Sequence, residues 1–205
     1  MMTLLPPPHK VEDLIREVTA VEIMPRFKQL GSDERWEKRP GSIVTAADIA
    51  AERILARELE DLLPGSVVVG EEMFEENPAV LDYLNYDDPV WVLDPVDGTS
   101  NFADGSENFG VMVALVIKRQ AVAGWIFRPV QEGMYVCELE AGAFCNGDRL
   151  KVEASPRSLA EMEGSLGGYL RRKTELPASF ARVTATRCIA VDYCALATGE
   201  IHFAH

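Results

Sequence analysis

The sequence predicts a mixed α and β fold in two parts that divide near Val152. Residues 46–63 carry apolar side chains at the spacing of an amphipathic helix. Three later apolar runs have the length of strands: residues 110–118, 121–128 and 134–139. The 205 residues, 47% hydrophobic and 26% charged, suffice for one large domain or two small ones. We therefore expect an α+β domain at residues 1–152 and the start of an α/β domain at residues 153–205.

The chain before residue 46 predicts a first helix followed by a loop. Apolar side chains recur at helical spacing over residues 11–27, with a bend at Pro25. Residues 31–41 are charged and rich in turn formers, so we expect a loop there. Lys38 and Arg39 could face an anion, but we expect them to be solvated charges of this loop.

The second helix has clear start and stop signals. Thr45 is a good N-cap, and Asp48 falls at the third helical position, which makes an acidic variant of the capping box. Pro-Gly at residues 64–65 ends the helix. On this pattern alone, Asp48 is a carboxylate that stabilises a helix start.

A short apolar strand at residues 67–69 leads directly into Gly70, Glu71 and Glu72. Two adjacent glutamates alone indicate a solvated surface, because Glu is almost never buried unless paired. Glu71, however, stands at the end of a strand, where ligand sites gather. Residues 73–88 are polar and acidic, and we expect an insertion with one short helix.

The most specific pattern of the chain is W-V-L-D-P-V-D-G-T-S-N-F at residues 91–102. The apolar run before Asp94 predicts a buried strand, and Asp94 and Asp97 leave its end. Pro95 fixes its own φ and favours an extended Asp94, so the two carboxylates can converge on one point. The letters D-P-x-D-G are also common in ordinary turns, so this part alone leaves both interpretations open.

The residues after Asp97 predict an anion-binding corner. Gly98 permits a positive φ or a close approach of the backbone to a ligand. If a helix follows, the amides of Gly98, Thr99 and Ser100 are free donors at its N-terminus, where anions bind. Carboxylates beside such amides suit divalent cations bridged to a phosphate, because Mg²⁺ takes carboxylate, phosphate and water oxygens.

The whole string D-P-V-D-G-T-S-N-F resembles the D-P-[IL]-D-G-T-x-N-F signature of the inositol monophosphatase family, the Mg²⁺-dependent, lithium-sensitive phosphomonoesterases. Val96 departs from the usual Ile or Leu but keeps an apolar branched side chain. Other segments that resemble the family are V-T-A-A-D at residues 44–48, G-E-E at residues 70–72 and G-A-F-C-N-G at residues 142–147. The resemblance implies a layered α/β/α/β/α sugar-phosphatase fold, a homodimer, and a second α/β layer that is incomplete in this chain.

The resemblance also assigns metal ligands. It implies that Glu71, Asp94 and the carbonyl of Val96 hold one Mg²⁺, and that Asp94 and Asp97 hold a second. In the family, the Asp of a later Trp-Asp motif completes the second metal site, and we expect this motif beyond His205. The sequence is therefore expected to be either a fragment of a longer protein or a shortened relative.

Catalytic and substrate-binding residues follow from the same resemblance. Asp48 pairs with Thr99, and this pair and Glu71 orient the attacking water. The amides of Gly98 and Thr99 hold phosphate oxygens, and Asp97 contacts the substrate. No Ser, Cys or His stands out as a nucleophile with a base partner, so direct attack by water is expected.

The segment R-C-I-A-V-D at residues 187–192 resembles the R-x-x-G-x-A segment whose loop touches the substrate in the family. Ala190 replaces the common Gly, and Asp192 stands where a small residue is usual. We therefore expect Asp192, together with the loop or strand end at residues 164–169, to determine the choice of substrate. Residues 155–162 predict a short helix early in this part of the chain.

The composition argues against several other kinds of protein. A net charge of −13 and a pI near 4.7 argue against a nucleic-acid partner, whereas bound metals can reverse the local field for a phosphate substrate. No apolar run approaches the roughly 20 residues that span a bilayer, and the N-terminus lacks the features of a signal peptide. The four cysteines have no zinc-like spacing, so we expect reduced thiols in a cytoplasmic protein.

The predicted function is Mg²⁺-dependent hydrolysis of a small phosphomonoester, first of all inositol monophosphate, by water that two metals activate. Histidinol phosphate, fructose 1,6-bisphosphate and 3′-phosphoadenosine 5′-phosphate are alternative substrates, because relatives of this fold process each of them. A non-catalytic metal- or partner-binding protein is an alternative of another class, because one metal ligand of the family is missing from the 205 residues. The residues whose joint presence favours the enzyme are Asp48, Glu71, Asp94, Asp97 and Thr99.

Overall fold

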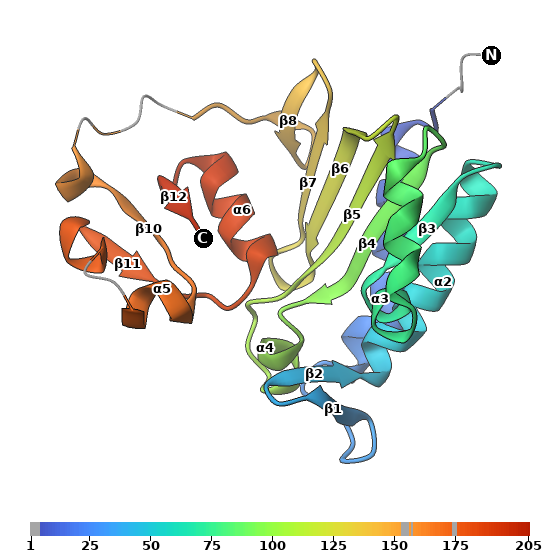
Figure 1. Ribbon diagram of the computed structural model, residues 1–205, viewed down its shortest axis with the longest axis horizontal. Coiled ribbons are helices and arrows are strands. Elements are labelled where there is room, and N and C mark those ends of the chain that lie inside the picture. Colours follow the sequence, from blue (N-terminus) through green and yellow to red (C-terminus); the bar gives the residue numbers. More distant parts are fainter. Residues whose placement is uncertain (1–4, 153–155, 157, 174–175) are drawn as a thin grey trace.

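The computed structural model describes residues 5–152, 156, 158–173 and 176–205. A mixed sheet of seven strands, in the order β3-β4-β5-β6-β7-β8-β9, forms its centre (Figure 1). The strands are β3 (Val67–Gly70), β4 (Val90–Asp97), β5 (Gly110–Ile117), β6 (Gln120–Arg128), β7 (Gly133–Glu138), β8 (Gly142–Cys145) and β9 (Asp148–Arg149). β3 and β4 run parallel, and each pair from β4 to β9 runs antiparallel. The three strands predicted from apolar runs are confirmed as β5, β6 and β7, with ends shifted by at most one residue.

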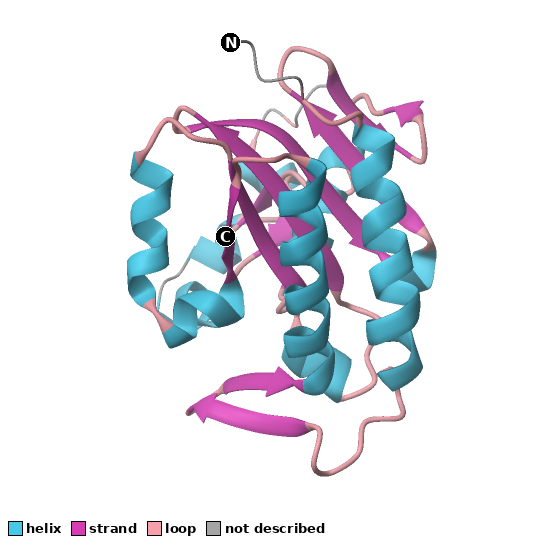
Figure 2. Ribbon diagram, turned by 90° about the vertical axis from the view of Figure 1, so that its right-hand side faces the viewer, coloured by secondary structure: helices cyan, strands magenta, loops and turns pink. Residues whose placement is uncertain are grey.

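Two helices, α1 (Pro8–Val18) and α2 (Ala46–Leu62), cover one face of this sheet, and Figure 2 shows them standing in front of it. The predicted capping box starts α2, since the Thr45 amide donates to Asp48 and the Thr45 hydroxyl accepts from the third helical amide. Leu55 of α2 is 0% exposed and packs in the core with Trp91 and Trp125. The helix predicted at residues 11–27 is α1 followed by a π turn (Thr19–Ile23) and a 3₁₀ turn (Met24–Arg26).

A hairpin replaces most of the loop predicted at residues 31–41. β1 (Arg35–Arg39) pairs antiparallel with β2 (Ser42–Thr45), which leads into α2. The prediction of a loop is therefore wrong for these residues. β1 is charged and four of its five side chains are exposed, so its sequence lacks the apolar alternation by which a strand is recognised. Its partner supplies the pairing instead.

β3 and β4 each end in a short helix. β3 leads into α3 (Glu71–Glu76), and the 3₁₀ helix η3 (Pro78–Asn85) follows within the predicted insertion. β4 leads into α4 (Thr99–Ala103) through Gly98, whose φ is +86°. A Cβ at Gly98 would lie 2.8 Å from the carbonyl oxygen of Asn108, so this corner needs glycine for both conformation and space.

The chain beyond Val152 forms a smaller parallel sheet in the order β11-β10-β12. Its strands are β10 (Glu163–Ser165), β11 (Arg182–Thr184) and β12 (Phe203–Ala204). The helix α6 (Ile189–Thr198) lies between the two sheets and contacts β5, β6 and β12 (Figure 1). The helices and sheets thus alternate in layers, as predicted, while the domain boundary at Val152 stays a prediction.

Short elements complete this part of the chain. They are α5 (Gly168–Lys173) and the 3₁₀ turns η4 (Pro129–Gln131), η5 (Leu159–Glu161) and η6 (Leu176–Ser179). The helix predicted at residues 155–162 is observed only as η5, and residues 155 and 157 lie outside the described ones. Residues 164–169 form a strand end, one of the two forms predicted, and then enter α5. No helix in the described part of the chain has the length and apolar character of a membrane span.

The packing of α2 predicts a contrast between two of its aliphatic residues. Leu55 is 0% exposed and Ile49 is 48% exposed on the same helix. Leu55→Ala should lower the free energy of unfolding by about 2–5 kcal/mol, because it leaves a cavity between α2 and the sheet. Ile49→Ala should change it by less than about 0.5 kcal/mol. Urea unfolding of both variants checks this, and equal losses would contradict the placement of α2.

Candidate metal and phosphate site

A polar pocket of about 500 Å³ lies where the two strand–helix corners meet the hairpin of β1 and β2. The residues that line it are Gly41, Ser42, Ile43, Glu71, Asp94, Asp97, Gly98, Thr99, Ser100 and Arg187. The structure therefore brings five of the eight predicted site residues to one pocket. Asp48 lies directly behind it, and Val96 places its side chain in the core.

Asp48 holds Thr99 in place. The Thr99 hydroxyl lies 3.0 Å from Asp48 Oδ1 and 3.0 Å from the Val96 carbonyl oxygen, so it can donate to either. Asp48 Oδ2 accepts from the amide and hydroxyl of Thr45, at 2.9 and 2.5 Å. Burial raises the pKa of Asp48 to about 6, although the hydrogen bonds from Thr45 and Thr99 oppose this rise. The predicted pairing of Asp48 with Thr99 is thus present as a hydrogen bond.

Negative charge is concentrated around Asp94. β4 continues past Asp94 as far as Asp97, but its register with β5 is irregular between these two residues. Burial raises the pKa of Asp94 well above its usual value, and the nearby charges of Glu71, Asp97 and Asp48 raise it further. A cation in the pocket would relieve this repulsion. The carboxylates therefore fit a divalent cation by chemistry and charge.

The same carboxylates do not form a preformed metal cluster. Within the described ranges, no three His, Cys, Asp or Glu side chains are arranged to hold a metal ion. Asp97 Oδ2 instead accepts from the Ala190 amide at 2.5 Å and from the Cys188 thiol at 2.9 Å. The roles of Glu71, Asp94, Val96 and Asp97 as metal ligands therefore stay predictions.

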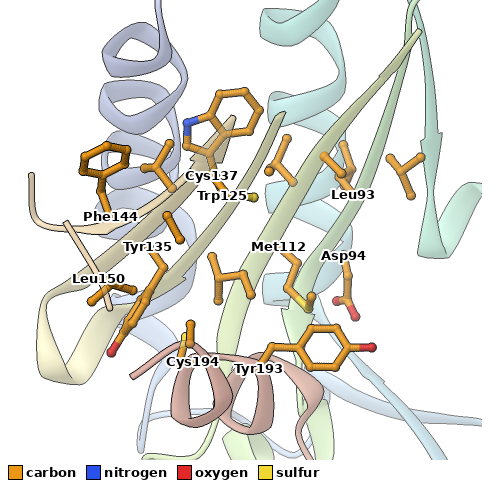
Figure 3. Close-up of a pocket in the computed structure, with 18 residues that line it drawn as sticks. Leu93, Asp94, Met112, Trp125, Tyr135, Cys137, Phe144, Leu150, Tyr193 and Cys194 are labelled. Carbon is orange, nitrogen blue, oxygen red and sulfur yellow. The ribbon is translucent and has the colours of Figure 1, made fainter. Parts of the chain in front are cut away.

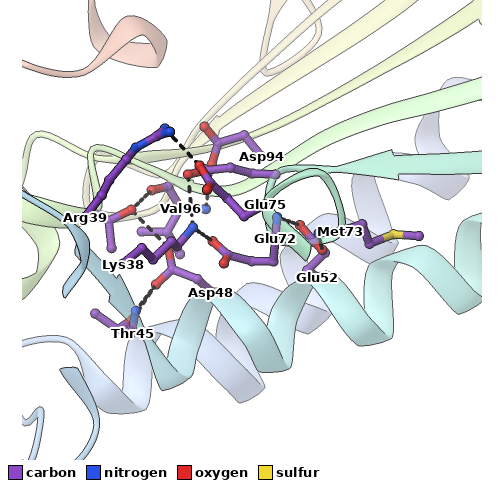
Figure 4. A network of polar contacts seen from close by, with 12 residues as sticks. Lys38, Arg39, Thr45, Asp48, Glu52, Glu72, Met73, Glu75, Asp94 and Val96 are labelled. Atoms are coloured by element: carbon purple, nitrogen blue, oxygen red, sulfur yellow. Dashed lines mark hydrogen bonds and ion pairs between the residues drawn. The ribbon is translucent and has the colours of Figure 1, made fainter. Parts of the chain in front are cut away.

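Lys38 pairs with a residue that lines the pocket, and its prediction as a solvated loop charge is wrong. Its side chain is only 12% exposed, and its ammonium lies 2.6 Å from Glu72 Oε1 and 3.5 Å from Glu71 Oε1 (Figure 4). Burial alone would lower the pKa of Lys38, but the hydrogen bonds and charges of Glu72 and Glu71 raise it. Arg39 is 66% exposed and pairs with Glu75 at 2.8 Å, as expected of a surface charge.

Glu52 is a buried carboxylate that sequence reasoning missed. It is 4% exposed, and its two oxygens accept from the amides of Glu72 and Met73, each at 2.9 Å (Figure 4). Burial raises the pKa of Glu52 to about 7, with added repulsion from Glu72 and Glu71. A signal was available in the sequence, because Glu52 follows Asp48 by one helical turn and has the spacing that places it on the same helix face as Leu55 and Leu59.

Arg187 belongs to the part of the chain beyond Val152 and lines the polar pocket. Its guanidinium donates to Asn101 Oδ1 at 3.0 Å, and the Asn101 amide group donates to the Thr186 carbonyl at 2.9 Å. Asp192, predicted to select the substrate, does not line the polar pocket. It is 5% exposed and accepts from the Thr186 hydroxyl at 2.8 Å, so its role in substrate choice stays a prediction.

A second pocket of about 450 Å³ lies between α6 and the sheet (Figure 3). Its lining is almost wholly apolar and includes Met112, Tyr135, Phe144 and Tyr193. Asp94 lines both this pocket and the polar one. The carboxylate therefore stands at the boundary between an apolar cavity and the charged pocket, which agrees with its strong desolvation.

Residues 11–205 match the family profile of the inositol monophosphatase family. The chain belongs to this family. It is 33% identical over 143 residues to the fructose-1,6-bisphosphatase/inositol-1-monophosphatase of Thermotoga maritima. This alignment covers 68% of this chain and 52% of that relative. It is 37% identical over 115 residues to the inositol-1-monophosphatase of Mesorhizobium japonicum. This second alignment covers 56% of this chain and 41% of that relative.

Solved structures of relatives have the same fold. The IMPase of Thermotoga maritima superposes with a TM-score of 0.77 at 26% identity, covering 95% of this chain and 73% of that one. The extragenic suppressor protein suhB of Bartonella henselae superposes with a TM-score of 0.79 at 23% identity, covering 95% of this chain and 76% of that one. The predicted family and layered fold are thus confirmed. The chain spans about half the length of the curated relatives it matches.

The buried carboxyl of Glu52 predicts how stability depends on pH in the absence of divalent cations. The pKa of Glu52 is about 7 in the folded chain, against 4.5 for an ordinary glutamate, so between these values the folded chain holds a proton that the unfolded chain has released. The resulting stabilisation is complete below the lower value and is lost as pH rises through the higher one. In EDTA, the free energy of unfolding should therefore fall from about pH 5 to about pH 8.

Urea unfolding across this range measures the slope for the parent, Glu52→Gln and Glu60→Gln. Glu52→Gln should give a shallower fall, because the glutamine has no proton to release. Glu60 lies exposed on the same helix, so Glu60→Gln should keep the slope of the parent. Parallel slopes for all three proteins would show that the pKa of Glu52 is not raised.

Proposed function

We propose that this chain carries the cation- and phosphate-binding part of a metal-dependent phosphomonoesterase, with inositol monophosphate as the first candidate substrate. The observation that carries the proposal is the meeting of Glu71, Asp94 and Asp97 in one pocket with the Gly98–Thr99 corner. Carboxylate oxygens beside backbone amides at a helix start suit a cation bridged to a phosphate. Membership of the inositol monophosphatase family supports the same reaction.

In this proposal, Glu71, Asp94, Asp97 and the carbonyl of Val96 hold Mg²⁺. When bound, the cations supply charge neutralisation and an activated water. Thr99 lies in the pocket and orients that water, because Asp48 holds its hydroxyl. Because the Thr99 hydroxyl donates to Asp48, its oxygen keeps lone pairs that can accept a hydrogen bond from that water.

The Gly98–Thr99 corner binds the phosphate. Gly98 takes the left-handed conformation that turns the chain from β4 into α4, and both residues line the pocket. Their amides stand at the start of a helix, where unpaired N–H groups bind anionic oxygens. Arg187 adds a positive charge to the lining of the pocket and donates a hydrogen bond to Asn101.

Fructose 1,6-bisphosphate is the second candidate substrate. The support is the Thermotoga maritima relative, whose name includes both fructose-1,6-bisphosphatase and inositol-1-monophosphatase. Arg187 offers a charge for a second phosphate in the same pocket. A non-catalytic, partner-binding role is the alternative of another class, and its support is that Lys38 already pairs with Glu71 while the described carboxylates form no metal cluster.

We further propose that the protein acts in the cytoplasm as a homodimer. All four cysteines are free thiols, which suits a reducing compartment. The homodimer rests on the resemblance to the family. Size-exclusion chromatography with light scattering tests it, and a monomer at micromolar concentration would remove this part of the proposal.

The direct test is phosphate release from inositol 1-phosphate and fructose 1,6-bisphosphate, with Mg²⁺ and with EDTA, by this chain and by the longest reading frame of its gene. Asp97→Asn should lower kcat/KM by about 100-fold or more, because it removes a negative charge from the proposed cation site. The asparagine carbonyl can still accept from the Ala190 amide, so the fold should persist.

Asp61→Asn is the matched control, because Asp61 is an exposed carboxylate of α2 and should leave the activity unchanged. Circular dichroism confirms that each variant is folded. Activity of Asp97→Asn within a few-fold of the parent would contradict the role of Asp97. The absence of metal-dependent activity from both chain lengths, on both substrates, would favour the non-catalytic alternative.

A further inference from the structure

The helix α2 carries two buried carboxylates one turn apart, and each reaches a different corner of the site. Asp48 accepts from Thr99 at the β4–α4 corner. Glu52 accepts from the amides of Glu72 and Met73 at the β3–α3 corner. Residues four apart lie on the same face of a helix, so α2 is a common support for both corners.

We propose that Glu52 is a positioning residue that holds the β3–α3 corner so that Glu71 enters the cation pocket. The inference rests on the proposed role of Glu71 in binding a cation. Glu71 directly precedes the two amides that Glu52 binds, and it is the first residue of α3. A shift of this corner would therefore move Glu71 relative to Asp94.

Gly70 shows how closely Glu52 approaches this corner. A Cβ at Gly70 would lie 2.4 Å from the carboxyl carbon of Glu52 and 2.5 and 2.7 Å from its oxygens. The φ of Gly70 is −100°, which other residues adopt readily, so glycine is needed here for space and not for conformation. Because Gly70 has no side chain, the Glu52 carboxylate has room to lie against the backbone of the G-E-E segment.

Glu71 and Glu72 differ in their distance from Lys38 and in whether they line the polar pocket. Lys38 draws Glu72 to 2.6 Å, whereas its distance from Glu71 is 3.5 Å. Glu71, but not Glu72, lines the polar pocket. Glu52 binds the backbone and Lys38 lies closest to Glu72, so Glu71 is the one of these two glutamates that lines the pocket while keeping a longer contact with Lys38.

The Glu52→Gln variant tests the hydrogen bonds of the carboxylate, because glutamine has nearly the same size and shape and so preserves the packing. A carboxylate has two acceptor oxygens, one for each amide, whereas a glutamine places an NH₂ group against one of the two N–H groups. The Glu52→Gln corner therefore loses one hydrogen bond and gains a donor–donor contact. Residues that support metal ligands in this way change metal affinity by about 10–100-fold when they are replaced.

The experiment is a Mn²⁺ titration followed by electron paramagnetic resonance, on this chain, its Glu52→Gln variant and the control Glu60→Gln. Glu52→Gln should weaken Mn²⁺ binding by about tenfold or more, and Glu60→Gln should bind as the parent does. A cooperative unfolding transition in EDTA shows that each variant is folded. Where the protein is active, a raised Mg²⁺ concentration should restore kcat of Glu52→Gln, since the loss lies in cation affinity.

A double-mutant cycle with Glu71→Gln separates positioning from a general loss of structure. If Glu52 acts through Glu71, its replacement should have little further effect on Mn²⁺ binding once Glu71 is glutamine. An equal effect in both backgrounds overturns the proposal. If Glu52→Gln does not fold, Glu52→Asp carries the same cycle, because it keeps the charge but withdraws the oxygens from the two amides.

The outcomes distinguish this inference from the proposed function. Mn²⁺ binding by the parent with no change in Glu52→Gln overturns the positioning role alone. The absence of Mn²⁺ binding by the parent overturns the cation site, and the positioning role with it. Weakened binding in Glu52→Gln that disappears in the Glu71→Gln background supports both.

Discussion

The hydrogen bonds of Asp48 are the interaction on which the site depends. One oxygen of this buried carboxylate caps α2 through Thr45, and the other accepts from Thr99 in the D-G-T segment. The start of a long helix and the corner that follows β4 are therefore joined through one side chain. Because α2 also packs Leu55 and Leu59 against the sheet, the position of Thr99 is tied to the main core.

Charge is the second constraint. Asp94 is surrounded by Glu71, Asp97 and Asp48 and is desolvated between a polar and an apolar pocket. Buried charges are costly unless they are paired, so such a group of carboxylates needs positive charge nearby. Lys38 supplies part of it by pairing with Glu71 and Glu72. A further cation in the pocket, as proposed, would offset more of this negative charge.

The two layers meet at the same motif. Asp97 accepts from the Ala190 amide and the Cys188 thiol at the start of α6, and Asn101 donates to the Thr186 carbonyl. Ala190 is also packed tightly against Gly110, because a Cβ added at Gly110 would lie 2.8 Å from the Cβ of Ala190. Of the two departures from the family pattern in residues 187–192, Ala190 therefore lies where the second layer contacts the acidic motif, whereas Asp192 contacts Thr186.

The sequence by itself determined the family, the capping box of α2, the strands β5 to β7 and five of the residues that line the pocket, because caps, periodicity and the D-P-V-D-G-T motif are local patterns. Only the tertiary structure decided which charges are buried. Lys38 was predicted as a solvated charge, β1 was predicted as a loop, and Glu52 was not singled out at all. Their environment comes from α3 and β2, which contact them only after the chain has folded. Burial and long-range pairing arise from packing between distant segments, so local sequence carries little sign of them.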